Sequence, residues 1–233
     1  MGGFNFGFGD DSAVRTSKPT LAPWDIYDVE FKGCEIREFS GKKDPTASYK
    51  VLDIKFEGEK GKFTKTLFFP KDGDDVPRKV QNKNGGESEL PSNFETTMAI
   101  IKQTASVLNP KGYEKLQAVS GKFKSFDELA VALVKVMDPV IGTKTQLKLV
   151  GVTKKGTVTA DIPRIVSYNK EGEIWISDNF VGSNLTFSSY EDTKRKEYQG
   201  ATPTKVEPKK AEATSTANTT DDKIDLADLV SGL

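Results

Sequence analysis

The chain has 233 residues, 34 of them basic and 34 acidic, with no histidine and a single cysteine, Cys34. The lack of histidine excludes Ser-His-Asp catalysis, Cys-His catalysis and nearly all zinc sites. One cysteine cannot form a disulfide within the chain, which favours a reducing compartment. No apolar run approaches the roughly 20 residues of a membrane span, and the N-terminus lacks the features of a secretory signal. We therefore expect a non-catalytic intracellular protein without cofactor, metal or membrane contact.

Composition divides the chain into four parts. Residues 1–22 are dense in glycine and carry three phenylalanines, which predicts a disordered arm. Its rings either pack against the body or a neighbouring subunit, or bind bases or a partner. Residues 23–200 are long enough for one folded domain. Residues 201–220 are a polar, disordered linker with almost nothing to bury, and residues 221–233 are an acidic tail.

The first part of the domain alternates as strands do, over Tyr27–Phe39, Tyr49–Phe56 and Lys62–Phe69. The second of these strands has an apolar face and a polar face, with Leu52, Ile54 and Phe56 on the first and Tyr49, Asp53 and Lys55 on the second. The polar, glycine-rich stretch Pro70–Pro91 is predicted to be a long exposed loop.

A helical insertion is predicted near residues 92–138. Capping boxes start two helices, at Ser92-x-x-Glu95 and at Ser125-x-x-Glu128, and Asn109-Pro110 and Asp138-Pro139 end them. A shorter helix is expected over Tyr113–Val119. The predicted buried stripe of the first helix is Phe94, Met98, Ile101, Ala105 and Leu108.

Strands resume after the insertion. Thr143–Thr153 and Thr157–Tyr168 are expected to form a hairpin, followed by a strand at Glu173–Ser177 and another at Asn184–Ser188. Tyr190–Tyr198 is predicted to be a charged terminal helix. The order of elements indicates an α+β fold, with a small antiparallel barrel of about five strands around the helical insertion.

Lysines and aromatic residues share the polar strand faces, which is typical of single-strand nucleic-acid binders, where cations follow the phosphates and rings stack on bases. The candidate contact residues are Lys62, Lys65, Phe68, Lys71, Lys144, Lys148, Lys154, Lys155, Arg164, Tyr168 and Trp175. Alternative roles stay open for some of these candidates and for their neighbours on the same strands. Phe63, Leu67 and Phe69 fit a core face better, Lys154-Lys155 also suits a solvated turn, and a helix covers Trp175 as readily as a base.

The tail is a short peptide with one acidic stripe and one apolar stripe at helical spacing. Its expected partner-binding residues are Asp221, Asp222, Asp225, Leu226, Asp228, Leu229 and Leu233. A helix this short is marginal alone in water, so we expect the apolar stripe to dock on another surface. The acids would recruit partners or compete with a nucleic acid for a basic groove.

Two other functions are weighed against nucleic-acid binding. A virion or scaffold assembly protein would use the N-terminal arm and C-terminal helix for protein contacts, and homo-oligomers are left open in either case. A metal-dependent nuclease could hold Mg²⁺ on Asp72, Asp74 and Asp75, although acids in a loop with Gly73 and Pro77 are usually only solvated.

Several runs between Trp24 and Tyr198 point to one family. They are Tyr49-Lys50-Val51-Leu52-Asp53-Ile54-Lys55-Phe56, Leu67-Phe68-Phe69-Pro70, Pro91-Ser92-Asn93-Phe94-Glu95, Leu147-Lys148-Leu149-Val150, Ile162-Pro163 and Phe187-Ser188-x-Tyr190-Glu191. The chain resembles the single-stranded DNA-binding proteins in the replication modules of tailed bacteriophages, crAss-like phages in particular.

The resemblance implies an oligonucleotide-binding (OB) barrel that coats single-stranded DNA in the cytoplasm of an infected bacterium. It also implies that the acidic tail contacts replication and recombination enzymes. The functional counterparts in bacteria end in an aromatic residue, whereas this chain ends in Gly232-Leu233. A docking pocket that expects a terminal ring is therefore not implied for this tail.

Overall fold

The computed structural model describes residues 18–41, 44, 46–71, 73–81, 85–154, 156–168, 174–176 (backbone only) and 178–200. The acidic tail, the linker and most of the N-terminal arm lie outside these residues. Leu21, which the sequence places in the arm, is only 3% exposed and belongs to the core. The Leu21 N–H donates to the carbonyl of Lys62, which holds this segment against the domain.

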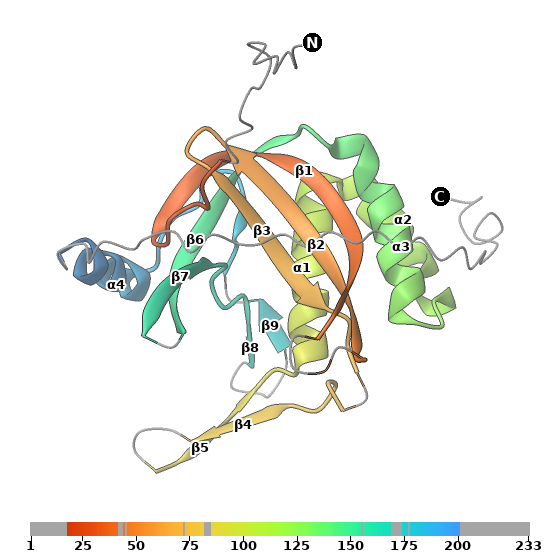
Figure 1. Ribbon diagram of the computed structural model, residues 1–233, viewed down its shortest axis with the longest axis horizontal. Helices are drawn as coiled ribbons and strands as arrows, with labels where there is room; N and C mark the ends of the chain where they lie inside the picture. Colours follow the sequence, from red (N-terminus) through yellow and green to blue (C-terminus); the bar gives the residue numbers. More distant parts are fainter. Residues whose placement is uncertain are drawn as a thin grey trace, which may run out of the picture.

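One antiparallel sheet forms the centre of the molecule (Figure 1). Its strands are β1 (Asp25–Ser40), β2 (Ser48–Gly58), β3 (Lys62–Phe68), β6 (Lys144–Lys154), β7 (Thr157–Asp161) and β10 (Val181–Gly182). The order is β10-β6-β1-β2-β3, and β7 also pairs with β6. The three strands predicted before the helices and the hairpin predicted at β6 are confirmed. Within the described chain no pairing joins β3 to β7, so a closed barrel is not seen.

The long strand β1 serves two partners. Its first residues, Asp25–Glu30, pair with β6, and Val29–Ser40 pair with β2. The β1–β2 register shifts between Phe31 and Gly33, where Gly33 has a φ of 107°. A bulge of this kind bends a strand and increases its twist, so β1 turns from one half of the sheet to the other.

The described chain has four α-helices, α1 (Asn93–Leu108), α2 (Pro110–Val119), α3 (Phe126–Met137) and α4 (Ser189–Gly200). The predicted capping box at Ser92 is complete. At Ser125 the hydroxyl caps the Glu128 N–H, but the Glu128 carboxylate accepts from Lys124 instead of the cap residue. The fold is therefore α+β, as predicted, with an antiparallel sheet.

The buried face of α1 is rotated from the predicted stripe. Phe94 is 39% exposed at the start of the helix, and Met98 is half-buried. Thr97, Ile100 and Thr104 are buried together with the expected Ile101, Ala105 and Leu108. Small polar residues therefore stand where the sequence pattern favoured large apolar ones.

Two short hairpins were not predicted: one lies in the expected loop and the other at the end of an expected continuous strand. β4 (Arg78–Gln81) pairs with β5 (Glu87–Leu90) inside the predicted loop, and this hairpin projects from the body (Figure 1). The strand predicted at Thr157–Tyr168 is broken around Pro163, because proline cannot donate to a strand ladder and β8 (Val166–Tyr168) pairs with β9 (Ile174–Ile176).

The strand expected at Asn184–Ser188 is absent from these described residues, and the short strand β10 precedes it. Asn184 has a φ of 57°, in the left-handed region that ends extended structure.

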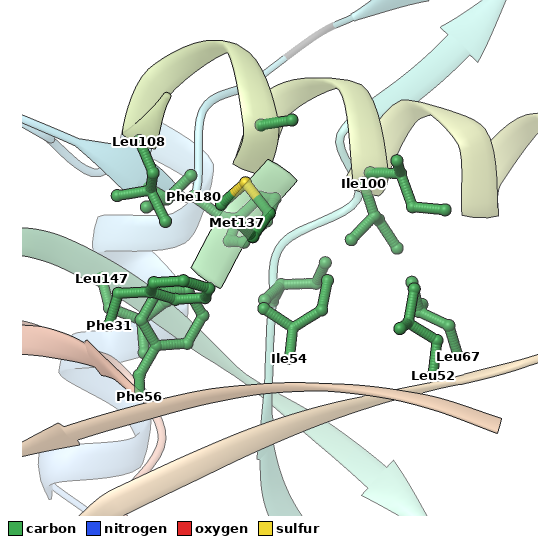
Figure 2. Close-up of a cluster of buried hydrophobic side chains, with 14 of the residues drawn as sticks. Phe31, Leu52, Ile54, Phe56, Leu67, Ile100, Leu108, Met137, Leu147 and Phe180 are labelled. Atoms are coloured by element: carbon green, nitrogen blue, oxygen red, sulfur yellow. The ribbon is translucent and has the colours of Figure 1, made fainter. Parts of the chain in front are cut away.

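The core lies between the sheet and α1. In Figure 2, Ile100 and Leu108 of α1 face the strand residues Phe31, Ile54 and Leu67. Phe180 and Met137 fill the same layer and are fully buried. The α1 side of β1, β2 and β3 is thus used for packing, which leaves their other side for the surface.

Candidate functional site

The surface side of β2 is not uniformly polar. Because side chains alternate along a strand, Tyr49, Val51 and Asp53 point away from the core face that Leu52 and Ile54 build. Val51 is nevertheless fully buried and Asp53 is only 4% exposed. Other side chains therefore cover this face, and they come from the neighbouring strands.

Three aromatic rings, Phe39, Tyr49 and Phe68, gather on this side, and we call them the ring cluster. Phe39 and Tyr49 are direct partners in the β1–β2 register and stack at 5.8 Å with a 26° angle between ring planes. The Phe68 ring lies 6.1 Å from Phe39 in an edge-on arrangement at 72°. Phe68 is 57% exposed, which is a large apolar area to leave in water.

Two cations lie over the rings. The Arg37 guanidinium carbon is 5.6 Å from the centre of the Phe39 ring, and the Lys71 Nζ is 4.5 Å from the centre of the Tyr49 ring. Both distances fall within the range of cation–π attraction. The ring cluster therefore offers flat apolar surfaces and positive charge on one exposed strand face.

Asp53 of β2 is a buried carboxylate that contacts both neighbouring strands on this face. Its Oδ2 accepts a hydrogen bond from Arg37 Nε at 3.0 Å, and Arg37 Nη2 lies 3.0 Å from the same oxygen. Its Oδ1 accepts from the Thr66 hydroxyl at 2.6 Å. The carboxylate is thus hydrogen-bonded across three strands, as a buried charge requires.

Of the candidate residues on β3 and after it, Phe68 belongs to the ring cluster and Lys71 lies over the Tyr49 ring of that cluster. Lys62 is exposed on the same side of β3 but at the opposite end of the strand. Lys65 points to the other side, where its Nζ forms an ion pair with Asp161 at 2.6 Å. The predicted run is therefore divided between two faces.

Lys148 lies on the side of β6 opposite Leu147 and Leu149, as predicted, but it is not at the surface. Its side chain is 1% exposed, and its Nζ contacts Asp178 at 2.5 Å, Glu191 at 3.2 Å and the Thr186 carbonyl at 2.9 Å. The segment before α4 and the first turn of that helix cover the face of β6 that carries Lys148. Lys144, at the start of β6, is exposed, and Leu147 and Leu149 are buried as predicted.

Glu191 binds Lys148 and also caps α4. Its carboxylate accepts from the Ser188 N–H at 2.8 Å, and the Ser188 hydroxyl accepts from the Glu191 N–H. Burial alone would raise the pKa of Glu191, but the Ser188 hydrogen bond and the Lys148 charge outweigh it and hold the pKa below its usual range.

The remaining candidates do not join the ring cluster. Lys154 is exposed at the β6–β7 turn, 3.9 Å from Asp161, and Lys155 lies outside the described residues. Arg164 lines a groove of about 790 Å³ beside α4. The Tyr168 hydroxyl lies 3.2 Å from the Glu95 carboxylate. The side chain of Trp175 is outside the described part of the chain.

Sequence reasoning missed Arg37 and Phe39 altogether, and it placed Tyr49 on the correct face without assigning it a role. The available signal was the β1–β2 hairpin. Phe39 and Tyr49 flank its connection, so pairing these strands makes them partners. Arg37 then shares the Phe39 side of β1, since the two are separated by one residue.

The carboxylates considered for a metal do not form a site in the described residues. Asp74 is used in the loop, where it accepts from the Lys71 N–H at 2.8 Å and from the Asn93 amide at 3.2 Å. Asp72 lies outside the described residues. Across the described ranges no group of three or more acidic, cysteine or histidine residues could hold a metal ion.

Comparison of the chain with known proteins and structures identifies no relative. No protein-family model, no curated protein and no solved structure matches the chain. None of the helices in the described segments is both long and apolar enough to cross a membrane.

Proposed function

We propose that the protein binds single-stranded DNA with the ring cluster, and that it protects such DNA during phage replication and recombination. The observation that carries the proposal is the group of three rings, the half-buried Phe39 and Tyr49 and the exposed Phe68, with two cations over them. Base–aromatic stacking contributes about 1–3 kcal/mol per base. A duplex keeps its bases stacked inside, so such a surface favours single strands.

The arrangement of strands supports an OB-like barrel within this proposal. Five strands run in the order β3-β2-β1-β6-β7, with the helices inserted between β3 and β6, and a partly open five-stranded barrel needs this number of strands. The ion pair between Lys65 of β3 and Asp161 of β7 joins the two ends of the order. OB barrels bind oligonucleotides on the face of their second and third strands and on the adjoining loop. Under this proposal the ring cluster, whose rings come from β1, β2 and β3, would lie on that binding surface.

The tail completes the proposal. Residues 221–233 would recruit replication and recombination proteins through the leucines and compete for the DNA surface through the aspartates, after a linker of about 20 residues. A single unpaired cysteine suits the reducing cytoplasm of an infected bacterium, the expected location under the resemblance.

Fluorescence anisotropy with labelled oligo-dT tests the proposal. Wild-type protein should bind the single strand at micromolar protein or below, bind the duplex more weakly, and lose affinity steeply with salt. Phe68→Ala should weaken binding by about 5- to 150-fold, the value of one stacked base. The matched control is Tyr190→Ala on α4, whose ring is 70% exposed but lies outside the ring cluster. Salt-insensitive or absent binding by wild-type protein would contradict the proposal.

The assembly-protein alternative makes the opposite prediction in solution. A scaffold would form oligomers without nucleic acid and would not respond to Phe68→Ala in a DNA-binding assay. Size-exclusion chromatography with and without oligo-dT separates the two.

A further inference from the structure

A buried carboxylate within the proposed DNA-binding surface would repel the phosphates of DNA, so its presence there calls for a physical explanation. Asp53 is such a group, at 4% exposure between the strands that carry the ring cluster. We propose that Arg37 is a phosphodiester-binding group of this face and that Asp53 is its positioning residue. This inference rests on the proposed function, because it names the chemistry of one subsite within the same surface.

The geometry of Arg37 leads to this assignment. A guanidinium is a flat fork with five N–H donors. The edge formed by Nε and Nη2 contacts Asp53, with both nitrogens 3.0 Å from one carboxylate oxygen. The guanidinium carbon Cζ lies over the Phe39 ring, 5.6 Å from its centre. Asp53 contacts only Nε and Nη2, so the other donor edge of the fork, one N–H of Nη1 with the second N–H of Nη2, is not used by Asp53.

The free edge is suited to a phosphodiester. Guanidinium N–H pairs bind phosphate oxygens in a bidentate manner, with geometric specificity that an ammonium lacks. The side chain is 47% exposed, so a strand that stacks bases on the ring cluster can reach it. Arg37 would therefore hold a backbone phosphate beside the nucleotides on Phe39 and Tyr49.

Asp53 affects this subsite in two opposite ways. Its negative charge repels a phosphate, which alone would make its removal favourable for binding. It also holds a side chain that otherwise loses much rotamer freedom on binding. Because Asp53 is buried and its charge is matched by Arg37, we expect the positioning effect to exceed the repulsion.

Glu35 provides the matched control. It is the direct β1 partner of Asp53, on the same side of the sheet. Its carboxylate is exposed and forms an ion pair with Lys55 instead of Arg37. Glu35→Gln removes one negative charge from the same face and leaves the Arg37 contacts in place.

The test compares oligo-dT affinity for Asp53→Asn, Glu35→Gln, Arg37→Ala and the double variant Arg37→Ala with Asp53→Asn. Glu35→Gln should bind as well as wild type or more tightly. Asp53→Asn should bind about tenfold more weakly, a loss typical of one charge-assisted hydrogen bond. Arg37→Ala should bind more weakly and lower the slope of log affinity against log salt by about 0.7, the value of one phosphate on a single strand.

The double variant separates positioning from simple charge. Once Arg37 is absent, Asp53 only repels DNA, so adding Asp53→Asn to Arg37→Ala should strengthen binding. A merely structural role of Asp53 would weaken binding in both backgrounds. Tighter or unchanged binding by Asp53→Asn alone would overturn the inference.

Two further measurements keep the outcomes distinct. Thermal unfolding without DNA shows whether loss of the Thr66 contact unfolds Asp53→Asn. If it does, Arg37→Lys carries the test, because it keeps the charge but loses the fork and should bind several-fold more weakly with an unchanged salt slope; wild-type affinity for Arg37→Lys would then overturn the inference. Failure of wild-type protein to bind oligo-dT would overturn the proposed function itself.

Discussion

Two regions on the outer face of one sheet carry similar sequence patterns and have different surroundings. The outer face of β1, β2 and β3 keeps its rings and cations at the surface, with Phe68 57% exposed. On β6, a lysine alternates with apolar residues in the same way, yet Lys148 is 1% exposed. Strand alternation specifies which side a residue occupies. It does not specify what later packs on that side.

The covering segment at β6 is itself built around the lysine. Asp178, Thr186 and Glu191 all place oxygens within 3.2 Å of Lys148 Nζ. Glu191 also closes the N-terminus of α4 through Ser188. A cation on β6 therefore helps to hold the C-terminal helix, while Arg37 and Lys71 lie over half-buried rings elsewhere on the same side of the sheet.

The largest expected difference between the two regions is in the effect of a lysine substitution on the free energy of unfolding. Lys148→Ala leaves two acids without their buried partner, so the free energy of unfolding should fall by about 3–5 kcal/mol. Urea unfolding measures the change. Lys144→Ala, on the exposed start of the same strand, is the control and should change stability by less than about 0.5 kcal/mol. A small loss for Lys148→Ala would mean that the triad is not structural.

The next effect concerns binding and compares two tyrosines. Tyr49→Leu removes a ring from the ring cluster and should weaken oligo-dT binding by about 1–3 kcal/mol. Tyr168→Leu alters a half-buried tyrosine on β8, hydrogen-bonded to Glu95, and should leave the affinity unchanged. Anisotropy titrations of both variants give the comparison. Equal losses would move the binding surface toward β8 and β9.

Much of the fold follows from local signals. The three strands before the helices show clear alternation, and the Ser92 capping box with Asn109-Pro110 brackets α1. These features depend on residues that are neighbours in sequence or within one helical turn. The hairpin of β4 and β5 was not predicted, because all four residues of β4 are exposed and give no apolar alternation.

The candidate site was predicted only in part, for a physical reason. Phe68 and Lys71 were named, but their partners Phe39 and Tyr49 come from other strands, and only the register brings them together. The predicted exposure of Lys148 is wrong because residues distant in sequence cover it. Its acids stand 30 and 43 residues further along the chain, so no local pattern shows that they cover it.

The pH dependence of stability tests the role of the buried charges around Lys148 on β6. The folded pKa of Glu191 is lowered, so its stabilising contribution is present above the unfolded value of 4.5 and is lost as pH falls through the folded pKa. Glu191→Gln should therefore cost about 1–2 kcal/mol at pH 7 and progressively less below pH 4.5.

Urea unfolding of Glu191→Gln and wild type between pH 3 and 7 gives this difference. Glu197→Gln, in an exposed pair with Lys194 on the same helix, is the control and should show little change at either end of the range. A difference that stays constant with pH would contradict the charged role of Glu191.

The smallest effect lies on the ring-bearing face. Lys71→Ala removes an exposed cation from the half-buried Tyr49 ring, and such surface contacts contribute about 0.5–1 kcal/mol. Oligo-dT affinity should fall two- to five-fold, and the salt slope should fall by about 0.7 if the ammonium also contacts a phosphate. Lys144→Ala removes an equally exposed lysine from β6 and should change neither quantity. Since both variants delete the same charge, net charge alone predicts equal effects, and only a localised strand on the ring cluster predicts a difference between them.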